Sequence, residues 1–176
     1  ENWHDLVIWS LEQEIYGLEN LALIPGTVGG AVVQNIGAYD VDIARFVRQV
    51  EVVDIRTGVA CSIPVENCGF AYRTSIFKQS ANRWMITAVV LALPQDWKPT
   101  VSYKALQTVL GDNTTPTATQ VSEAVMKIRQ DKLPDWEEVG TAGSFFANPR
   151  VDNETLKTLQ ESYPDIPVFH NYDSLE

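Results

Sequence analysis

The sequence predicts an α+β fold, and three observations support this class. Apolar residues recur at helical spacing in residues 2–16 and 117–134. Between these helices, residues 46–64 and 84–94 are rich in β-branched and apolar residues, as strands are. The strands and helices do not alternate regularly, which disfavours a doubly wound parallel sheet. A chain of 176 residues predicts one domain, or one domain and part of another.

The first predicted element is a helix over residues 2–16. Asn2 is a suitable N-cap, Asp5 places an acid in the first turn, and Gly17 is a natural C-terminal stop. Its expected inner face consists of Trp3, Leu6, Val7, Leu11 and Ile15.

The central segment predicts three strands. Residues 46–64 read as two strands around a turn at Arg56–Gly58. Residues 84–94, "WMITAVVLALP", contain so few polar side chains that a buried strand is expected.

Two helices are predicted in the C-terminal part. Thr117 and Gln120 form a capping box, and Pro134 ends the helix that they begin. Its apolar stripe is Val121, Ala124, Val125 and Ile128. A further helix should begin near Asp152 or Asn153, with Leu156, Leu159 and Tyr163 on its inner face.

Charge and composition exclude several classes of partner. The formal net charge is −10, whereas nucleic acids and acidic membrane surfaces require basic patches. No apolar run is long enough to span a bilayer. Cys61 and Cys68 match no common zinc spacing, and we expect them to be reduced core or near-core thiols of a cytoplasmic protein.

The most unusual stretch is "GLENLALIPGTVGGAVVQNIGAYD", residues 17–40. It holds five glycines and is nearly free of charge, but it matches neither the dinucleotide fingerprint nor the P-loop. One interpretation is a buried turn whose glycines supply positive φ. The other is a backbone that closely approaches a flat ligand with polar edges, such as an isoalloxazine.

This stretch resembles the flavin-binding segment of the UDP-N-acetylenolpyruvoylglucosamine reductase (MurB) family. Four later stretches also resemble that family's motifs, in the same order: "CGFAYRTSIFK", "PTVSYKAL", "RQDKLPD" and "GTAGSFFANP". The second of these is similar to the tyrosine loop of the longer, type I members. The resemblance covers essentially residues 1–176.

The resemblance implies a fold, a reaction and two cofactors. The fold would be a FAD-binding domain of the MurB and vanillyl-alcohol-oxidase type, followed by the start of a substrate-binding domain. The reaction would reduce UDP-N-acetylglucosamine enolpyruvate to UDP-N-acetylmuramate in peptidoglycan precursor synthesis. FAD would deliver the hydride, and NADPH would reduce the flavin. The residues that this implies for FAD binding are Pro25, Gly26, Thr27, Gly29, Gly30, Asn35, Gly37, Ala38 and Tyr39.

Two catalytic residues are implied. Arg73 alone could be a buried ion-pair partner, but the resemblance makes it the cation that stabilises the enol intermediate. Ser144 alone reads as a turn or cap residue, and the resemblance makes it the proton donor to the carbon beside the carboxylate. The family's last acid/base residue is a Glu, and the surroundings of Glu176 do not match its motif.

The implied substrate contacts are individually ordinary residues. Tyr103 could simply pack, Lys132 could serve the helix dipole, and Asn148 could form a turn before Pro149. In the family, matching residues hold the diphosphate and uridine of the substrate. Arg129, three residues before Lys132, is a further candidate for the same anion. The complete implied set is Tyr72, Tyr103, Arg129, Lys132 and Asn148.

The expected organisation is a second FAD-binding subdomain over residues 1–133 and a truncated substrate-binding domain over residues 134–176. We interpret the chain as a fragment of a monomeric parent that lacks the family's N-terminal and C-terminal parts. We therefore expect it to bind FAD poorly, to turn over little, and to self-associate through exposed faces. The alternatives are another flavin-dependent oxidoreductase of the same superfamily and a non-catalytic binding module.

Overall fold

The computed structural model describes residues 1–80, 82–136, 138–140 and 148–168. It divides into two compact units, Glu1–Gly143 and Ser144–Glu176. These units are defined by compactness, whereas the expected boundary between residues 133 and 134 separates a cofactor-binding part from a substrate-binding part. That boundary stays a prediction.

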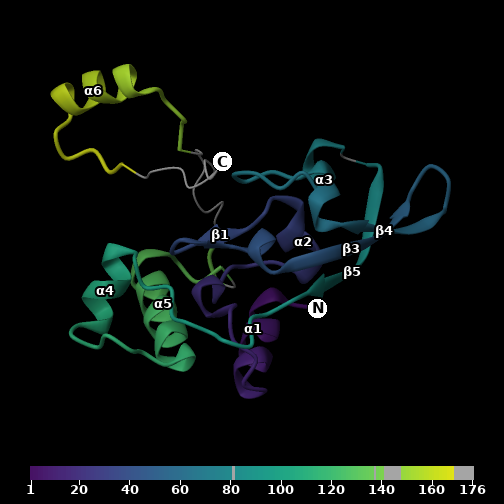
Figure 1. Ribbon diagram of the computed structural model, residues 1–176, viewed down its shortest axis with the longest axis horizontal. Coiled ribbons are helices and arrows are strands. Elements are labelled where there is room, and N and C mark those ends of the chain that lie inside the picture. Colours follow the sequence, from purple (N-terminus) through teal and green to yellow (C-terminus); the bar gives the residue numbers. More distant parts are fainter. Residues whose placement is uncertain (81, 137, 141–147, 169–176) are drawn as a thin grey trace. The chain divides into compact units, whose positions relative to one another are not determined.

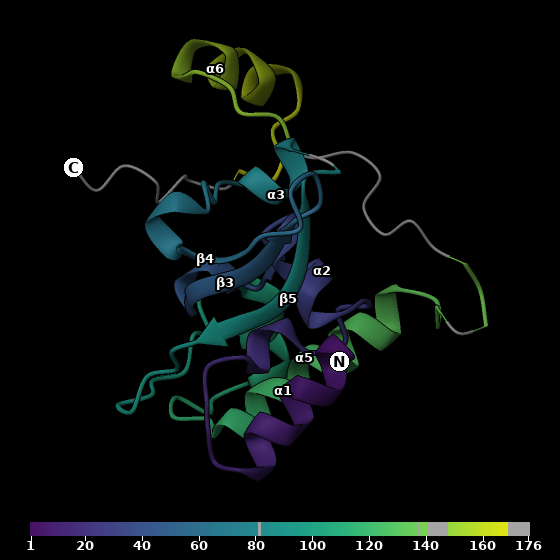
Figure 2. The same ribbon diagram turned by 90° about the vertical axis from the view of Figure 1, so that its right-hand side faces the viewer.

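An antiparallel sheet lies at the centre of the first unit. Its strands are β3 (Val47–Asp54), β4 (Ala60–Pro64) and β5 (Trp84–Leu91). β3 lies in the middle of the order β4-β3-β5, so that Val50 is paired with Ile63 on one side and with Val89 on the other (Figure 2). The predicted pair of strands around a turn at residues 56–58 is confirmed.

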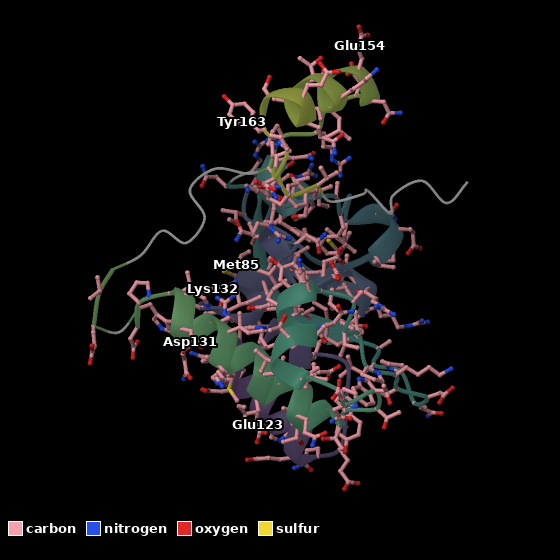
Figure 3. The ribbon with its side chains drawn as sticks, turned by 90° about the vertical axis from the view of Figure 1, so that its left-hand side faces the viewer. Met85, Glu123, Asp131, Lys132, Glu154 and Tyr163 are labelled. Carbon is pink, nitrogen blue, oxygen red and sulfur yellow. The ribbon has the colours of Figure 1, made fainter. Side chains whose placement is uncertain are left out.

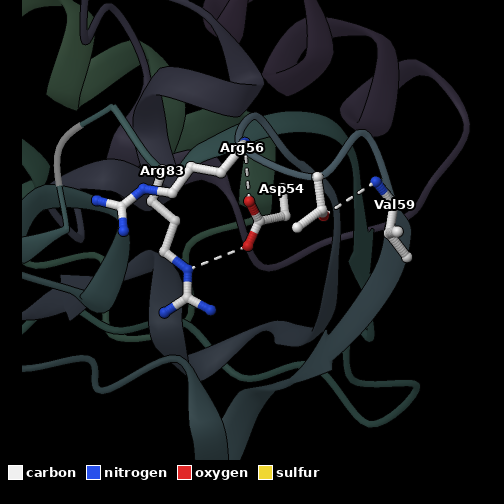
Figure 4. A network of polar contacts seen from close by, with 5 residues as sticks. Asp54, Arg56, Val59 and Arg83 are labelled. Atoms are coloured by element: carbon white, nitrogen blue, oxygen red, sulfur yellow. Dashed lines mark hydrogen bonds and ion pairs between the residues drawn. The ribbon is translucent and has the colours of Figure 1, made fainter.

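The turn between β3 and β4 is closed by Asp54. One carboxylate oxygen accepts a hydrogen bond of 2.9 Å from the Arg56 amide, and the other accepts one of 3.2 Å from Arg83 Nε (Figure 4). Thr57 Oγ1 accepts from the Val59 amide at 3.3 Å. Hydrogen bonding from the Arg56 backbone is the main cause that lowers the pKa of Asp54, and Arg83 adds to it. These contacts fix the tight turn that the sequence predicts.

The prediction that residues 84–94 form a buried strand is only partly right. β5 exists, but its side chains alternate between partly covered and exposed, and 53% of Met85 is exposed. Helix α2 (Val28–Val33) packs against the strand, and a Cβ built on Gly29 would lie 3.6 Å from Ile86 Cγ2. The strand is half-exposed because one of its faces is covered and the other is not.

Helix α1 (Trp3–Glu12) is shorter than the sequence predicts. Asn2 is its N-cap, as expected, and its side chain accepts from the amides of His4 and Asp5. The helix ends four residues before Tyr16 because Glu14 adopts a left-handed conformation with φ 57°, a common way to end a helix. Trp3 and Val7 are buried, whereas Ile15 is 41% exposed and does not belong to the inner face.

Two helices pack beside each other in the lower part of Figure 1, α4 (Lys104–Leu110) and α5 (Ala118–Lys132). The capping box of Thr117 and Gln120 at the start of α5 is present, as is the buried stripe from Val121 to Ile128. Helix α4 is not among the elements that the sequence predicts, and only its first three residues belong to the stretch that resembles the tyrosine loop. The remaining short elements of this unit are η1 (Glu19–Leu21), β1 (Gly37–Ala38), β2 (Val41–Asp42), η2 (Ile43–Arg45), η3 (Val65–Asn67) and α3 (Ile76–Gln79).

The second unit contains helix α6 (Asn153–Ser162). Asp152 is its N-cap and accepts a hydrogen bond of 2.8 Å from the Thr155 amide, which confirms the predicted start. The predicted inner face is partly supported, because Leu156 and Leu159 are partly covered, whereas Tyr163 is 63% exposed and no residue of the helix is fully buried. An apolar stripe alone does not bury a helix, since a partner surface must cover it.

The two cysteines are both free, but they differ in environment. Cys68 is fully buried, as expected, and burial raises the pKa of its thiol to about 11. Cys61 lies on β4 and is exposed, so its expected place in or near the core is wrong. Among the described residues, no helix combines the length and apolar character needed to cross a membrane.

Candidate functional site

The glycine-rich segment of residues 17–40 contains regular secondary structure and is not a single loop. It contains η1, α2 and β1, and Thr27 caps α2 by accepting a hydrogen bond of 3.0 Å from the Gly30 amide. The start of α1 is joined to it, because the Trp3 amide donates to the carbonyl of Gly26 at 3.0 Å and the Val28 amide donates to that of Glu1 at 3.1 Å. The middle of the segment is therefore hydrogen-bonded to the backbone at the start of α1.

A cavity of about 130 Å³ opens at this anchor. Four of the predicted cofactor residues line it: Pro25, Gly26, Thr27 and Gly30. The volume is below the roughly 300–1,000 Å³ that is typical of small-molecule pockets, so it could hold only one portion of a flavin. The other lining residues are Trp3, Ile24, Ala31, Gln34 and Ile36.

Several polar side chains donate to backbone carbonyls of the segment. Arg129 Nε on α5 donates to the carbonyl of Leu23 at 3.1 Å, and Asn20 Nδ2 donates to that of Tyr39 at 3.1 Å. Arg73 donates to the carbonyls of Asn35 and Gly37. The shape of the segment therefore depends on side chains that are remote in sequence.

Left-handed backbone is concentrated around the same carbonyls. Leu23, Asn35, Tyr39 and Arg73 have φ values of 55°, 49°, 49° and 54°, which non-glycine residues seldom adopt. Each such residue costs of order 1–3 kcal/mol and persists only where its surroundings hold it. Strained residues of this kind cluster at functional sites, which favours a ligand-binding interpretation of the segment over a simple buried turn.

Arg73, the predicted enol-stabilising cation, lies against the predicted cofactor residue Gly37. A Cβ on Gly37 would lie only 2.6 Å from Arg73 Nη1, so a side chain there would displace the guanidinium. The guanidinium also lies over the Tyr72 ring, 5.0 Å from its centroid. Among the described residues, the guanidinium contacts two backbone carbonyls and one aromatic ring.

Tyr39, Tyr103 and Arg129 form a second cluster. The rings of Tyr39 and Tyr103 meet edge to face with centroids 5.2 Å apart, and the Arg129 side chain is close enough to interact electrostatically with Tyr39. Burial raises the pKa of Tyr39, and burial lowers the pKa of Arg129. The structure thus brings a predicted cofactor residue next to two predicted substrate residues.

The remaining predicted substrate residues are less enclosed. Lys132 is exposed near the C-terminal end of α5 (Figure 3), whereas Arg129 turns toward the segment. Tyr72 is 40% exposed. Asn148 belongs to the second unit and is exposed, and Ser144 and Glu176 lie outside the described residues.

Sequence reasoning missed two buried polar residues of the segment, Glu19 and Asn20. Glu19 is 3% exposed and accepts hydrogen bonds from the Gly17 amide at 2.7 Å and from Trp97 Nε1 at 2.6 Å. Asn20 is completely buried. The sequence does contain a sign of this, because Glu19 and Asn20 are a polar pair inside the apolar run "GLENLAL". Polar side chains that are buried with such a run need specific hydrogen-bond partners.

Comparisons with known proteins agree with this picture. Residues 1–63 match the family model described as "FAD binding domain". The chain is 47% identical over 172 residues to the UDP-N-acetylenolpyruvoylglucosamine reductase of Polynucleobacter asymbioticus. This alignment covers 94% of this chain and 50% of that protein. It is 43% identical over 170 residues to the reductase of the same name from Pseudoalteromonas atlantica. This alignment covers 96% of this chain and 48% of that protein.

A solved structure supports the fold. The UDP-N-acetylenolpyruvylglucosamine reductase (MurB) of Thermus caldophilus aligns with a TM-score of 0.59 and 24% sequence identity, covering 84% of this chain and 46% of that one. The likeness confirms the α+β fold class, and the family model over residues 1–63 supports a flavin-domain architecture. The chain spans about half the length of the relatives that it matches.

Proposed function

Because the chain belongs to the UDP-N-acetylenolpyruvoylglucosamine reductase family, we propose that the whole protein is an FAD-dependent reductase of peptidoglycan precursor synthesis. Its substrate would be UDP-N-acetylglucosamine enolpyruvate, its product UDP-N-acetylmuramate and its reductant NADPH. The observation that carries the proposal is the 47% identity to a reductase of that name over 94% of this chain.

The residues around the cavity fit a flavin. Gly26 lines the cavity with φ +124°, and no described atom beyond its chain neighbours lies within 4 Å of the position that a Cβ would occupy there. Thr27 and Gln34 add polar groups to the apolar walls. Small residues beside a few polar groups suit a flat ring with polar edges. The proposed set is Pro25, Gly26, Thr27, Gly29, Gly30, Asn35, Gly37, Ala38 and Tyr39. When bound there, FAD supplies hydride chemistry.

Arg73 is the proposed stabiliser of negative charge on the enol intermediate. A guanidinium has five N–H donors, more than its two carbonyl contacts use. Those contacts orient it before substrate arrives, and pre-oriented donors are effective because they need no reorganisation during the reaction. Ser144 is the proposed donor of the proton to the carbon beside the carboxylate.

The proposed contacts to the diphosphate and uridine are Tyr103, Lys132 and Asn148. Tyr72 is a further proposed contact to the same substrate. Hydroxyl, ammonium and amide donors are suitable partners for a diphosphate. Arg129 is a weaker candidate for direct contact, because its guanidinium already donates to the Leu23 carbonyl at 3.1 Å and interacts electrostatically with Tyr39. Its proposed role is to hold the segment. The proposed functional division remains a flavin part over residues 1–133 and a substrate part over residues 134–176.

Turnover by the full-length protein tests the proposal. We expect purified protein to contain FAD and to form UDP-N-acetylmuramate with NADPH faster than with NADH. Bound FAD without this product would favour another flavin-dependent oxidoreductase, and absence of flavin would exclude both. In parallel, an FAD titration of residues 1–176 alone should show weak binding, because the cavity of about 130 Å³ can hold only one portion of a flavin.

A further inference from the structure

Two segments that are 60 residues apart in sequence are joined beside the candidate site. Tyr39 and Asp40 connect β1 to β2, and residues 100–103 lead into α4. Ser102 Oγ donates a hydrogen bond of 2.7 Å to Asp40 Oδ2, and the rings of Tyr39 and Tyr103 meet edge to face at 5.2 Å. We call this the Tyr39–Tyr103 junction.

The side chain of Asn20 is hydrogen-bonded to both segments of the junction. Its Nδ2 donates to the carbonyl of Tyr39 at 3.1 Å and to the carbonyl of Thr100 at 2.8 Å. Because Asn20 is completely buried, water does not compete for these two bonds. One side-chain amide therefore holds both segments by their backbones.

The backbone at Tyr39 and Asp40 is unusual for its sequence. β1 and β2 pair with Ala38 opposite Val41, which leaves Tyr39 and Asp40 as a two-residue connection. Their φ values are +49° and +63°. Hairpin turns with positive φ at both central residues favour Asn-Gly or Asp-Gly, so a Tyr-Asp pair needs support from outside the turn. Asn20 and Ser102 provide it.

We propose that Asn20, Asp40 and Ser102 are positioning residues that join Tyr103 to the cofactor segment, so that FAD and the uridine diphosphate portion of the substrate bind with positive coupling. This inference rests on the proposed function, in which Tyr39 contacts FAD and Tyr103 contacts the nucleotide. A ligand that orders one side of the junction also orders the other, and the coupling must be reciprocal.

A binding cycle on the full-length protein measures the coupling. The dissociation constant of UDP is determined for the FAD-loaded and the deflavinated protein, and that of FAD with and without saturating UDP. We expect UDP to bind the FAD-loaded protein at least roughly fivefold more tightly, with the same factor for FAD. We also expect UDP to perturb the absorbance spectrum of bound flavin.

Variants of the junction should reduce this factor. We expect Ser102→Ala and Asp40→Ala each to lower the coupling factor by roughly two- to tenfold, which corresponds to one hydrogen bond. Asp40→Asn retains an acceptor oxygen for Ser102 and should restore most of the coupling. Thr87→Ala is the matched control, because it removes one exposed hydroxyl that donates to the Glu51 carbonyl at 3.1 Å between β5 and β3. Asn20→Asp removes the amide donor to the carbonyls of Tyr39 and Thr100 and should abolish the coupling.

The outcomes separate the two proposals. Tight binding of FAD and of UDP with a wild-type coupling factor of one would overturn the inference and leave the proposed function intact. An unchanged factor in both Ser102→Ala and Asp40→Ala would also overturn it. Failure of the wild-type protein to bind FAD or UDP would overturn the proposed function, and the inference with it.

Discussion

At the scale of single residues, the site depends on backbone carbonyls that are held by distant side chains. Arg73 donates to the Gly37 carbonyl, and a Cβ on Gly37 would lie 2.6 Å from Arg73 Nη1, so a side chain at position 37 would displace the guanidinium. A family motif can indicate that Arg73 is functional, but it does not reveal which carbonyls orient it. The contact is between residues 36 positions apart, and no local pattern encodes it.

The first prediction concerns Gly37→Ala. The added methyl would lie 2.6 Å from Arg73 Nη1 and 3.1 Å from the Val41 carbonyl, so we expect the guanidinium to shift. Misplacement of a catalytic group by about 1 Å can cost on the order of 100-fold in rate. Measurement of kcat for the full-length reductase should show a loss of this order, with a smaller effect on FAD affinity.

Gly58→Ala is the matched control for this variant. It introduces a methyl into open space at a residue with φ +72°, in the β3–β4 turn. We expect it to lower the melting temperature while the folded enzyme retains wild-type kcat. Equal kcat values for Gly37→Ala and the wild type would show that Gly37 does not position Arg73.

At the scale of elements, local sequence predicted those elements that are determined locally. The capping box of Thr117 and the N-caps Asn2 and Asp152 are signals that span three or four residues, and the structure confirms them. Helix α2 was missed because glycines at positions 29 and 30 lower helix propensity, and packing of α2 against β5 overrides that preference. The Tyr39–Asp40 turn was missed because its residues are atypical for positive φ.

The second prediction concerns the pH dependence of the β3–β4 turn. The pKa of Asp54 is lower in the folded state than its ordinary value of 3.8, so the folded state favours the carboxylate. The resulting stabilisation is present above that value and is lost as the pH falls through the folded pKa. Asp54→Asn should therefore melt at a lower temperature than the wild type at pH 7, and the difference should shrink below about pH 4.

Arg83→Gln separates the two contributions to this effect. It removes the ion pair of 3.2 Å but retains the hydrogen bond from the Arg56 amide. Because Arg83 is 48% exposed, we expect a smaller fall in melting temperature than for Asp54→Asn. A melting difference for Asp54→Asn that persists unchanged to pH 2 would contradict the assignment.

At the scale of the whole molecule, fold class and family were predictable, but the arrangement of the site was only partly so. The structure brings Tyr39, Tyr103 and Arg129 into one cluster and Gly37 and Arg73 into another. The sequence could not predict the direction in which Arg129 turns, because three-residue spacing groups it with Lys132, whereas the contact to Leu23 depends on how α5 packs. The proposed roles of Ser144 and Asn148 rest on the family resemblance.

The most direct test of the proposed reductase activity is to follow the absorbance of flavin in the full-length protein under anaerobic conditions. We expect added NADPH to bleach the bound FAD, and UDP-N-acetylglucosamine enolpyruvate then to restore its oxidised spectrum with formation of one equivalent of product. A flavin that NADPH reduces but that this substrate leaves reduced would show that the protein does not catalyse this reaction.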